Sequence, residues 1–141
     1  MREVKFLPIE PALQMKEIGF DEQCLAVFYH KGDLTEFYMY HKKFFHTLNV
    51  CKNSELTEKF PNYLATPLYQ DAFEWFRDEH GLEGKVERAE DYTWYKWEVT
   101  RYNENGKKYV ADYYEYETYR EAENDCLHCL INEVKNYTKR I

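Results

Sequence analysis

The fold is decided by residues 93–114, which read TWYKWEVTRYNENGKKYVADYY. In the first half of this stretch, apolar side chains such as Trp97 and Val99 alternate with polar ones, the period of two that is typical of a half-buried strand. Asn105-Gly106 is a turn signal, and a second aromatic run follows it. The stretch therefore predicts two antiparallel strands, over residues 93–102 and 107–114.

Two amphipathic helices flank these strands. Upstream, Thr66-Pro67 offers a hydroxyl N-cap and a proline at the first helical position, and Gly81 follows the last apolar position of the helix. Downstream, Thr118 and Glu121 form a capping box at the start of a long helix that reaches about residue 137. A weaker strand is predicted near residues 85–89, so residues 66–137 have the order α-β-β-β-α.

The first 64 residues are organised differently. Apolar side chains at helical spacing predict a short helix over residues 10–18, with Gly19 as its C-terminal cap. Two apolar runs, residues 24–29 and 34–40, flank Lys31-Gly32-Asp33 and predict a β-hairpin. Residues 41–50 fit neither period, and the polar residues 51–65 predict a connecting loop.

These patterns predict an α+β protein with two parts. Residues 1–64 form an N-terminal helix and hairpin subdomain, and residues 65–141 form an α-β-β-β-α domain with a three-stranded antiparallel sheet backed by two helices. Two arrangements remain open at this point. The N-terminal part is either a separate domain or a cover for the free face of the C-terminal sheet.

Charge and composition exclude several classes of function. The formal net charge is −7, and residues 65–141 contribute −6 of it, which opposes binding to a bare phosphate backbone. No apolar run approaches the roughly 18 residues that a membrane span needs, and the start of the chain has no apolar signal region. We therefore expect a cytoplasmic protein that does not bind membranes, with its four Cys reduced.

The order of elements in residues 66–137 resembles a double-stranded-RNA-binding domain. That family binds RNA through a lysine-rich start of its second helix and a Gly-Pro-x-His loop between its first two strands. Here the helix start reads TYREAE (residues 118–123), with a single Arg, and the loop reads AEDY (residues 89–92). The resemblance implies the fold of that family, and the missing residues argue against binding of double-stranded RNA.

A second resemblance rests on two phrases, ATPLYQDAFEWFR (residues 65–77) and YREAE (residues 119–123). Both are similar to a family of small uncharacterised proteins of gut Bacteroides-type bacteria and their phages. Membership would imply a phage or mobile-element context. The family carries no assigned activity, so no functional residue follows from it.

The most conspicuous cluster of reactive side chains is Cys126-Leu127-His128-Cys129. Its Cys-x-x-Cys spacing resembles half of a zinc site, but neither Cys24 nor Cys51 has a partner at ligand spacing. Cys126 lies on the apolar stripe of the predicted helix, where Cys commonly packs as a small hydrophobic residue. We therefore predict core packing for this cluster, and no metal or cofactor.

No motif fixes a catalytic group, because nothing in the sequence places any His beside a base or acid partner. The chain also has only 5 Gly and no phosphate-binding glycine loop. The sequence accordingly predicts a protein that is not an enzyme. The His concerned are His30, His41, His46, His80 and His128.

Aromatic side chains on the two paired strands suggest a binding surface, since large exposed aromatic patches commonly contact a partner. The main hypothesis is a non-catalytic module that binds another protein or a second copy of itself. The alternative is a protein that sequesters a small ligand such as a nucleotide, by stacking it on aromatic rings beside a few cations. The candidate binding residues are Trp94, Trp97, Arg101, Lys107, Lys108 and Tyr109.

Overall fold

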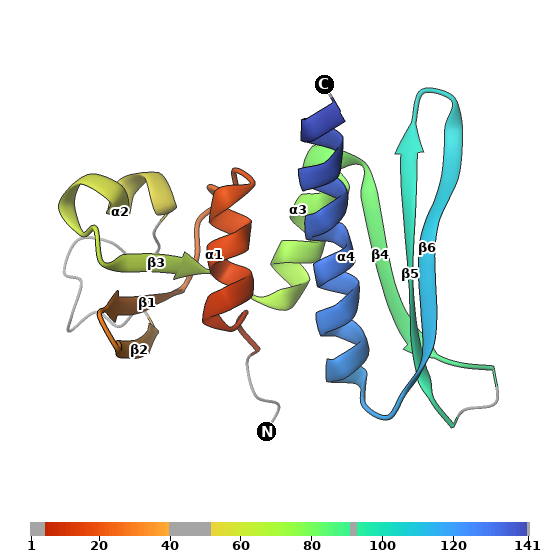
Figure 1. Ribbon diagram of the computed structural model, residues 1–141, viewed down its shortest axis with the longest axis horizontal. Coiled ribbons are helices and arrows are strands. Elements are labelled where there is room, and N and C mark those ends of the chain that lie inside the picture. The colour runs from red at the N-terminus through yellow and green to blue at the C-terminus, as the bar shows by residue number, and fades with distance from the viewer. Residues whose placement is uncertain (1–4, 40–51, 91–92, 141) are drawn as a thin grey trace. The chain divides into compact units, whose positions relative to one another are not determined.

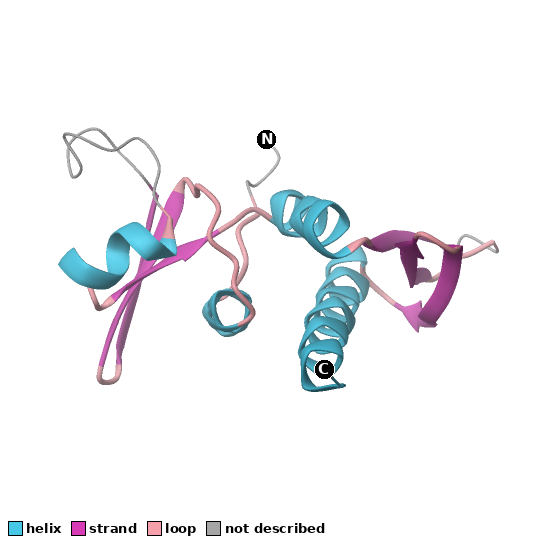
Figure 2. Cartoon of the chain, turned by 90° about the horizontal axis from the view of Figure 1, so that it is seen from above, coloured by secondary structure: helices cyan, strands magenta, loops and turns pink. Residues whose placement is uncertain are grey.

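The computed structural model describes residues 5–39, 52–90 and 93–140. It confirms the α+β class: four helices and two separate three-stranded antiparallel sheets make up most of the described residues (Figures 1 and 2). The chain divides into two compact units, residues 1–71 and residues 72–141. Each unit has its own sheet.

The first unit contains a sheet in the order β2-β1-β3. The predicted hairpin is confirmed as β1 (Ala26–Lys31) and β2 (Leu34–Met39), joined at Gly32-Asp33, with Gly32 at φ +62°. The third strand, β3 (Tyr63–Thr66), pairs with β1 on its other side. Residues 41–50 and the predicted strand end at Tyr40 lie outside the described residues.

The predicted first helix is confirmed as α1 (Ile9–Glu17). Its end is a Schellman motif, in which the N–H of Gly19 donates to the carbonyl of Lys16 and the N–H of Phe20 donates to that of Met15. Gly19 adopts φ +97°, a conformation that glycine reaches without a steric penalty. The sequence therefore located both the helix and the residue that ends it.

The predicted loop over residues 51–65 is wrong, because this stretch contains α2 (Asn53–Lys59) and β3. Buried Asn53 makes this possible. Its side-chain oxygen accepts from the N–H of Ala65 at 3.0 Å, and its amide nitrogen donates to the carbonyl of Phe20 at 3.4 Å. One buried side chain thus ties α2 to β3 and to the end of α1, since buried polar groups are retained where they find partners.

The predicted N-cap Thr66 is also wrong, because α3 (Tyr69–His80) begins three residues later. Thr66 instead ends β3, and its hydroxyl donates to the carbonyl of Leu7 at 2.8 Å. The sequence-based division after residue 64 differs from the compact units for the same reason. Residues up to Thr66 belong to the N-terminal sheet, and that unit continues to Asp71.

The second unit contains a sheet in the order β4-β5-β6, with strands β4 (Leu82–Arg88), β5 (Tyr95–Asn103) and β6 (Gly106–Tyr116). The long helix α4 (Tyr119–Arg140) runs along one face of this sheet (Figures 1 and 2). None of the described helices combines the length and the apolar character that crossing a bilayer requires. The buried side chains between α4 and the sheet include Leu82, Trp97, Val99, Cys126, Leu127, Leu130 and Ile131.

Strand register separates the two faces of the second sheet. Trp97 and Val99 of β5 are buried, so side chains of the same parity, including Arg101, lie on the face toward α4. Two irregularities in β6 keep this alternation in step with β5, and at one of them Glu115 adopts φ +89°. The opposite face carries, among others, Lys96, Tyr102, Lys107, Tyr109, Asp112 and Tyr114.

A short hydrogen-bond chain connects the sheet to α4. The indole N–H of Trp97 donates to the hydroxyl of Tyr116 at 2.8 Å, and that hydroxyl donates to the Oδ2 atom of Asp125 at 2.7 Å. Burial, followed by the bond to Asp125, raises the pKa of Tyr116 to about 12. This hydrogen-bond series gives the buried indole N–H of Trp97 an acceptor, which it would otherwise lack.

We expect Gly84→Ala to destabilise the second unit. An added Cβ atom at this position would lie 2.7 Å from the Cε1 atom of Phe73 and 2.9 Å from the Cδ1 atom of Leu130. Overpacking of this kind costs about 1–3 kcal/mol. Chemical denaturation of the variant measures the loss. The control Lys85→Ala changes the exposed neighbour on the same strand and should stay within about 0.5 kcal/mol. An equal effect of the two variants contradicts the packing of α3 and α4 at Gly84.

The Tyr116 chain predicts a specific pH dependence. Because folding raises the pKa of Tyr116 from 10.0 to about 12, its contribution is fully present below pH 10 and is lost as the pH rises towards 12. Tyr116→Phe should lower the free energy of unfolding by about 1–3 kcal/mol at neutral pH and should flatten the alkaline fall. Denaturation followed by Trp fluorescence, at neutral pH and at about pH 12, checks this. The control Tyr114→Phe, at an exposed ring, should leave both quantities unchanged.

Candidate functional site

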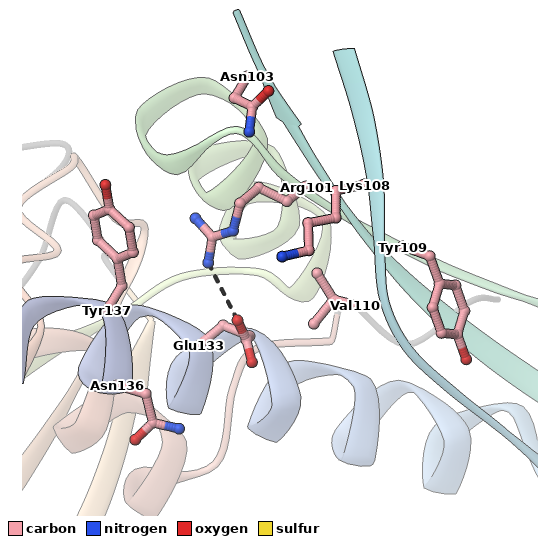
Figure 3. Close-up of a pocket in the computed structure, with 8 residues that line it drawn as sticks. All are labelled: Arg101, Asn103, Lys108, Tyr109, Val110, Glu133, Asn136 and Tyr137. Atoms are coloured by element: carbon pink, nitrogen blue, oxygen red, sulfur yellow. Dashed lines mark hydrogen bonds and ion pairs between the residues drawn. The ribbon is translucent and has the colours of Figure 1, made fainter. Parts of the chain in front are cut away.

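A groove of about 390 Å³ lies between the β5–β6 hairpin and the last turns of α4 (Figure 3). Residues of β5 and β6 form one wall of the groove, and residues of α4 form the other wall. The lining is mostly polar, with amide, charged and aromatic side chains. Its members are Arg101, Asn103, Lys108, Tyr109, Val110, Glu133, Asn136 and Tyr137.

Arg101 is fixed from two directions. Its Nη2 atom lies 3.2 Å from the Oε2 atom of Glu133, and its guanidinium carbon lies 5.1 Å from the centre of the Tyr137 ring. Its side chain is only 20% exposed, so the ion pair is screened less than a surface pair. A guanidinium that is bonded to a carboxylate and stacked on a ring has little freedom left, which makes Arg101 a preorganised donor.

Lys108 gives the groove a positive balance. It is paired with Arg101 across β5 and β6, and Figure 3 shows its side chain on the same side of the sheet as Arg101 and Glu133. Among the ion pairs of the described residues, none includes Lys108. Two cations therefore face one carboxylate. The groove can attract a small anion even though the chain as a whole is negative.

His80, at the end of α3, lies within the electrostatic influence of Arg101. Burial lowers the pKa of His80, the charge of Arg101 lowers it further, and the nearby Glu79 opposes both effects. The ring of His80 also lies 4.8 Å from that of Trp75, centre to centre, in an edge-to-face arrangement. A His with a lowered pKa is neutral at pH 7 and adds no positive charge near Arg101.

A second feature lies on the sheet face directed away from α4. Tyr102, Tyr109 and Tyr114 are 46%, 56% and 60% exposed, and we call these three residues the tyrosine surface. A hydrogen bond with Asp112 raises the pKa of Tyr109, so a carboxylate adjoins the rings. Tyrosine rings combine a large apolar area with a polar hydroxyl, a combination that is enriched at protein interfaces.

The six residues singled out from the sequence do not form one site. Arg101, Lys108 and Tyr109 line the groove, although Figure 3 shows the Tyr109 ring pointing away from Arg101 and Lys108. Lys107 is paired with Tyr102 on the opposite face. Trp94 precedes β5, at the other end of that strand from Arg101.

Trp97 is the clearest difference from the sequence-based hypothesis. It is 8% exposed and bonded to Tyr116, so its ring belongs to the core and is not available for stacking on a ligand. The alternation of side chains along β5 already indicated this, because Trp97 has the parity of Val99. An aromatic residue is a surface candidate only where its parity points outward.

Sequence reasoning missed the residues that α4 contributes to the groove, Glu133, Asn136 and Tyr137. Their spacing of three and four residues places them on one helix face, and this was the signal available in the sequence. No local pattern, however, indicates that this face meets Arg101, which lies 32 positions earlier in the chain.

The Cys-x-x-Cys cluster lies inside α4. Burial raises the pKa of the Cys126 thiol strongly, and burial also raises the pKa of Cys129 to about 11. A thiol with so high a pKa is a weak nucleophile and a poor metal ligand at neutral pH. Within residues 5–39, 52–90 and 93–140, no group of three or more His, Cys, Asp or Glu side chains is placed to hold a metal ion.

No protein-family model, curated protein or solved structure matches the chain. The resemblances to double-stranded-RNA-binding domains and to the Bacteroides and phage family therefore stay predictions. What the chain can bind is indicated by its own residues, of which the tyrosine surface and the groove beside Arg101 are the two candidates.

Proposed function

We propose that this protein is a non-catalytic binding module whose tyrosine surface contacts another protein chain. The observation that carries the proposal is the exposure of Tyr102, Tyr109 and Tyr114 on one face of two paired strands. A three-stranded sheet can bury one face under α4, and an aromatic opposite face gains free energy when a partner covers it, at about 25 cal/mol per Å² of apolar area.

Several features support protein as the partner class. The rings lie among charged side chains of both signs, including Lys96, Lys107 and Asp112, a mixture that is typical of the polar surroundings of interface aromatics. The net charge of −6 over residues 65–141 opposes nucleic acids. A phage or mobile-element setting, which the sequence resemblance implies, is compatible with a small binding protein.

Photo-crosslinking tests this function. A photoreactive phenylalanine derivative replaces Tyr109 or Tyr114 in the full chain, and the protein is irradiated in extract from its host. We expect defined covalent adducts from both positions, because a bound partner lies within reach of the rings. The matched control is Tyr119, an exposed tyrosine on α4 outside the tyrosine surface, which should give none. Equal labelling at all three positions, or no adduct at any, contradicts the proposal.

A second candidate function, capture of a small anionic ligand such as a nucleotide, is favoured by the groove alone. Arg101 is held in place by Glu133 and Tyr137, and Lys108 adds a cation without an ion pair among the described residues. Asn103 and Asn136 supply amide groups for hydrogen bonds. The volume of about 390 Å³ is within the usual range of small-molecule pockets, so a small anionic ligand fits the groove.

A thermal-shift screen with nucleotides and inorganic phosphate tests the second function. A ligand at about 100 times its Kd should stabilise the folded chain by about 2.7 kcal/mol. Lys108→Ala should abolish that shift, whereas the control Lys107→Ala, on the opposite face of β6, should preserve it. If no member of the screen stabilises the wild-type chain, or if both variants respond alike, the groove is not a nucleotide site.

A further inference from the structure

One of the two edges of the second sheet is formed by β6, its longest strand, with 11 residues. β6 pairs with β5 on one side, and within the described residues it makes no other backbone-to-backbone hydrogen bond. A long strand edge of this kind is a template for pairing with another strand. From this edge we propose that the partner of the tyrosine surface is a second copy of this chain, paired antiparallel with it through β6.

The charge distribution along β6 argues for a second copy as the partner. The strand begins with Lys107 and Lys108, and its second half carries Asp112 and Glu115. Antiparallel pairing about a two-fold axis places the half of β6 that carries the lysines in one copy along the half that carries the carboxylates in the other, twice over. Opposite charges on neighbouring strands stabilise a sheet, and like charges opposite each other destabilise it. The strand is therefore complementary to itself in the antiparallel direction.

The face of the sheet on which each β6 side chain lies determines the register of pairing between the two copies. Residues opposite each other in an antiparallel pair must point to the same face of the sheet. On the face away from α4, β6 presents Lys107, Tyr109, Asp112 and Tyr114. An axis between Val110 and Ala111 pairs these residues with one another, so that Tyr109 lies opposite Asp112 of the second copy and Lys107 lies opposite Tyr114 of the second copy. The diagonal neighbour of Lys107 on the same face is then Asp112 of the second copy, within reach of the long lysine side chain.

The same axis brings two tyrosine surfaces onto one continuous six-stranded sheet. The inference rests on the proposed function, since it names the partner for the same surface. Such a contact consists of one strand and its exposed rings, so its area falls at the low end of stable interfaces. We therefore expect a dimer that dissociates on dilution, with a Kd on the order of micromolar.

The test measures molar mass by sedimentation or light scattering over a range of concentrations of the full chain. The wild-type mass should rise from 17.3 kDa towards about twice that value. A basic-to-acidic variant, Lys107→Glu with Lys108→Glu, and an acidic-to-basic variant, Asp112→Lys with Glu115→Lys, should each stay monomeric because like charges then meet. An equal mixture of the two should recover the doubled mass. Lys85→Glu, on the other edge strand β4, is the control and should dimerise as the wild type does.

The outcomes separate this inference from the proposed function. Circular dichroism establishes that both charge variants are folded before their masses are compared. A wild-type chain that stays monomeric at all concentrations overturns the pairing of β6, and so does a dimer that neither charge variant disrupts. Either result leaves photo-crosslinking at Tyr109 and Tyr114 free to identify a different protein partner. Absence of adducts at those positions overturns the proposed function as well.

Discussion

The second unit depends on the burial of one face of β5 under α4. Trp97 and Val99 point toward the helix, where they meet a continuous apolar stripe that includes Leu127 and Leu130. Burial of apolar area on this scale is the largest favourable contribution to folding, and a three-stranded sheet needs such a cover to be stable. Every side chain of opposite parity is thereby directed away from the helix.

This constraint accounts for both candidate sites. Arg101 has the inward parity but lies near the end of β5, where it meets the last turns of α4 and pairs with Glu133. The core therefore ends in a polar groove. The tyrosine surface is the consequence on the other face, because Tyr102 and Tyr109 have the parity that α4 does not cover. The packing of α4 on one face of the sheet thus accounts for both the groove and the tyrosine surface.

The first unit is held together by a buried polar side chain as well as by apolar packing. Its sheet is small, and a single buried polar side chain, Asn53, joins three of its elements. A buried amide with its donors and acceptors satisfied defines one arrangement, since any other would leave those groups without partners. The segment from residue 51 to residue 65 looks like a polar loop in the sequence because its structure comes from these distant bonds and not from an apolar period.

The sequence by itself determined the elements whose signals are local. Alternation along β5, the helical stripe that ends at Gly81 and the Schellman glycine at position 19 each act within a few residues, so they could be predicted without a fold. Only the tertiary structure decided what depends on partners far along the chain. Thr66 became a strand end because the carbonyl of Leu7 accepts its hydroxyl, and Arg101 became part of a groove because α4 returns past it with Glu133 and Tyr137. Such contacts join residues whose separation in sequence carries no periodic signal, and only packing brings them together.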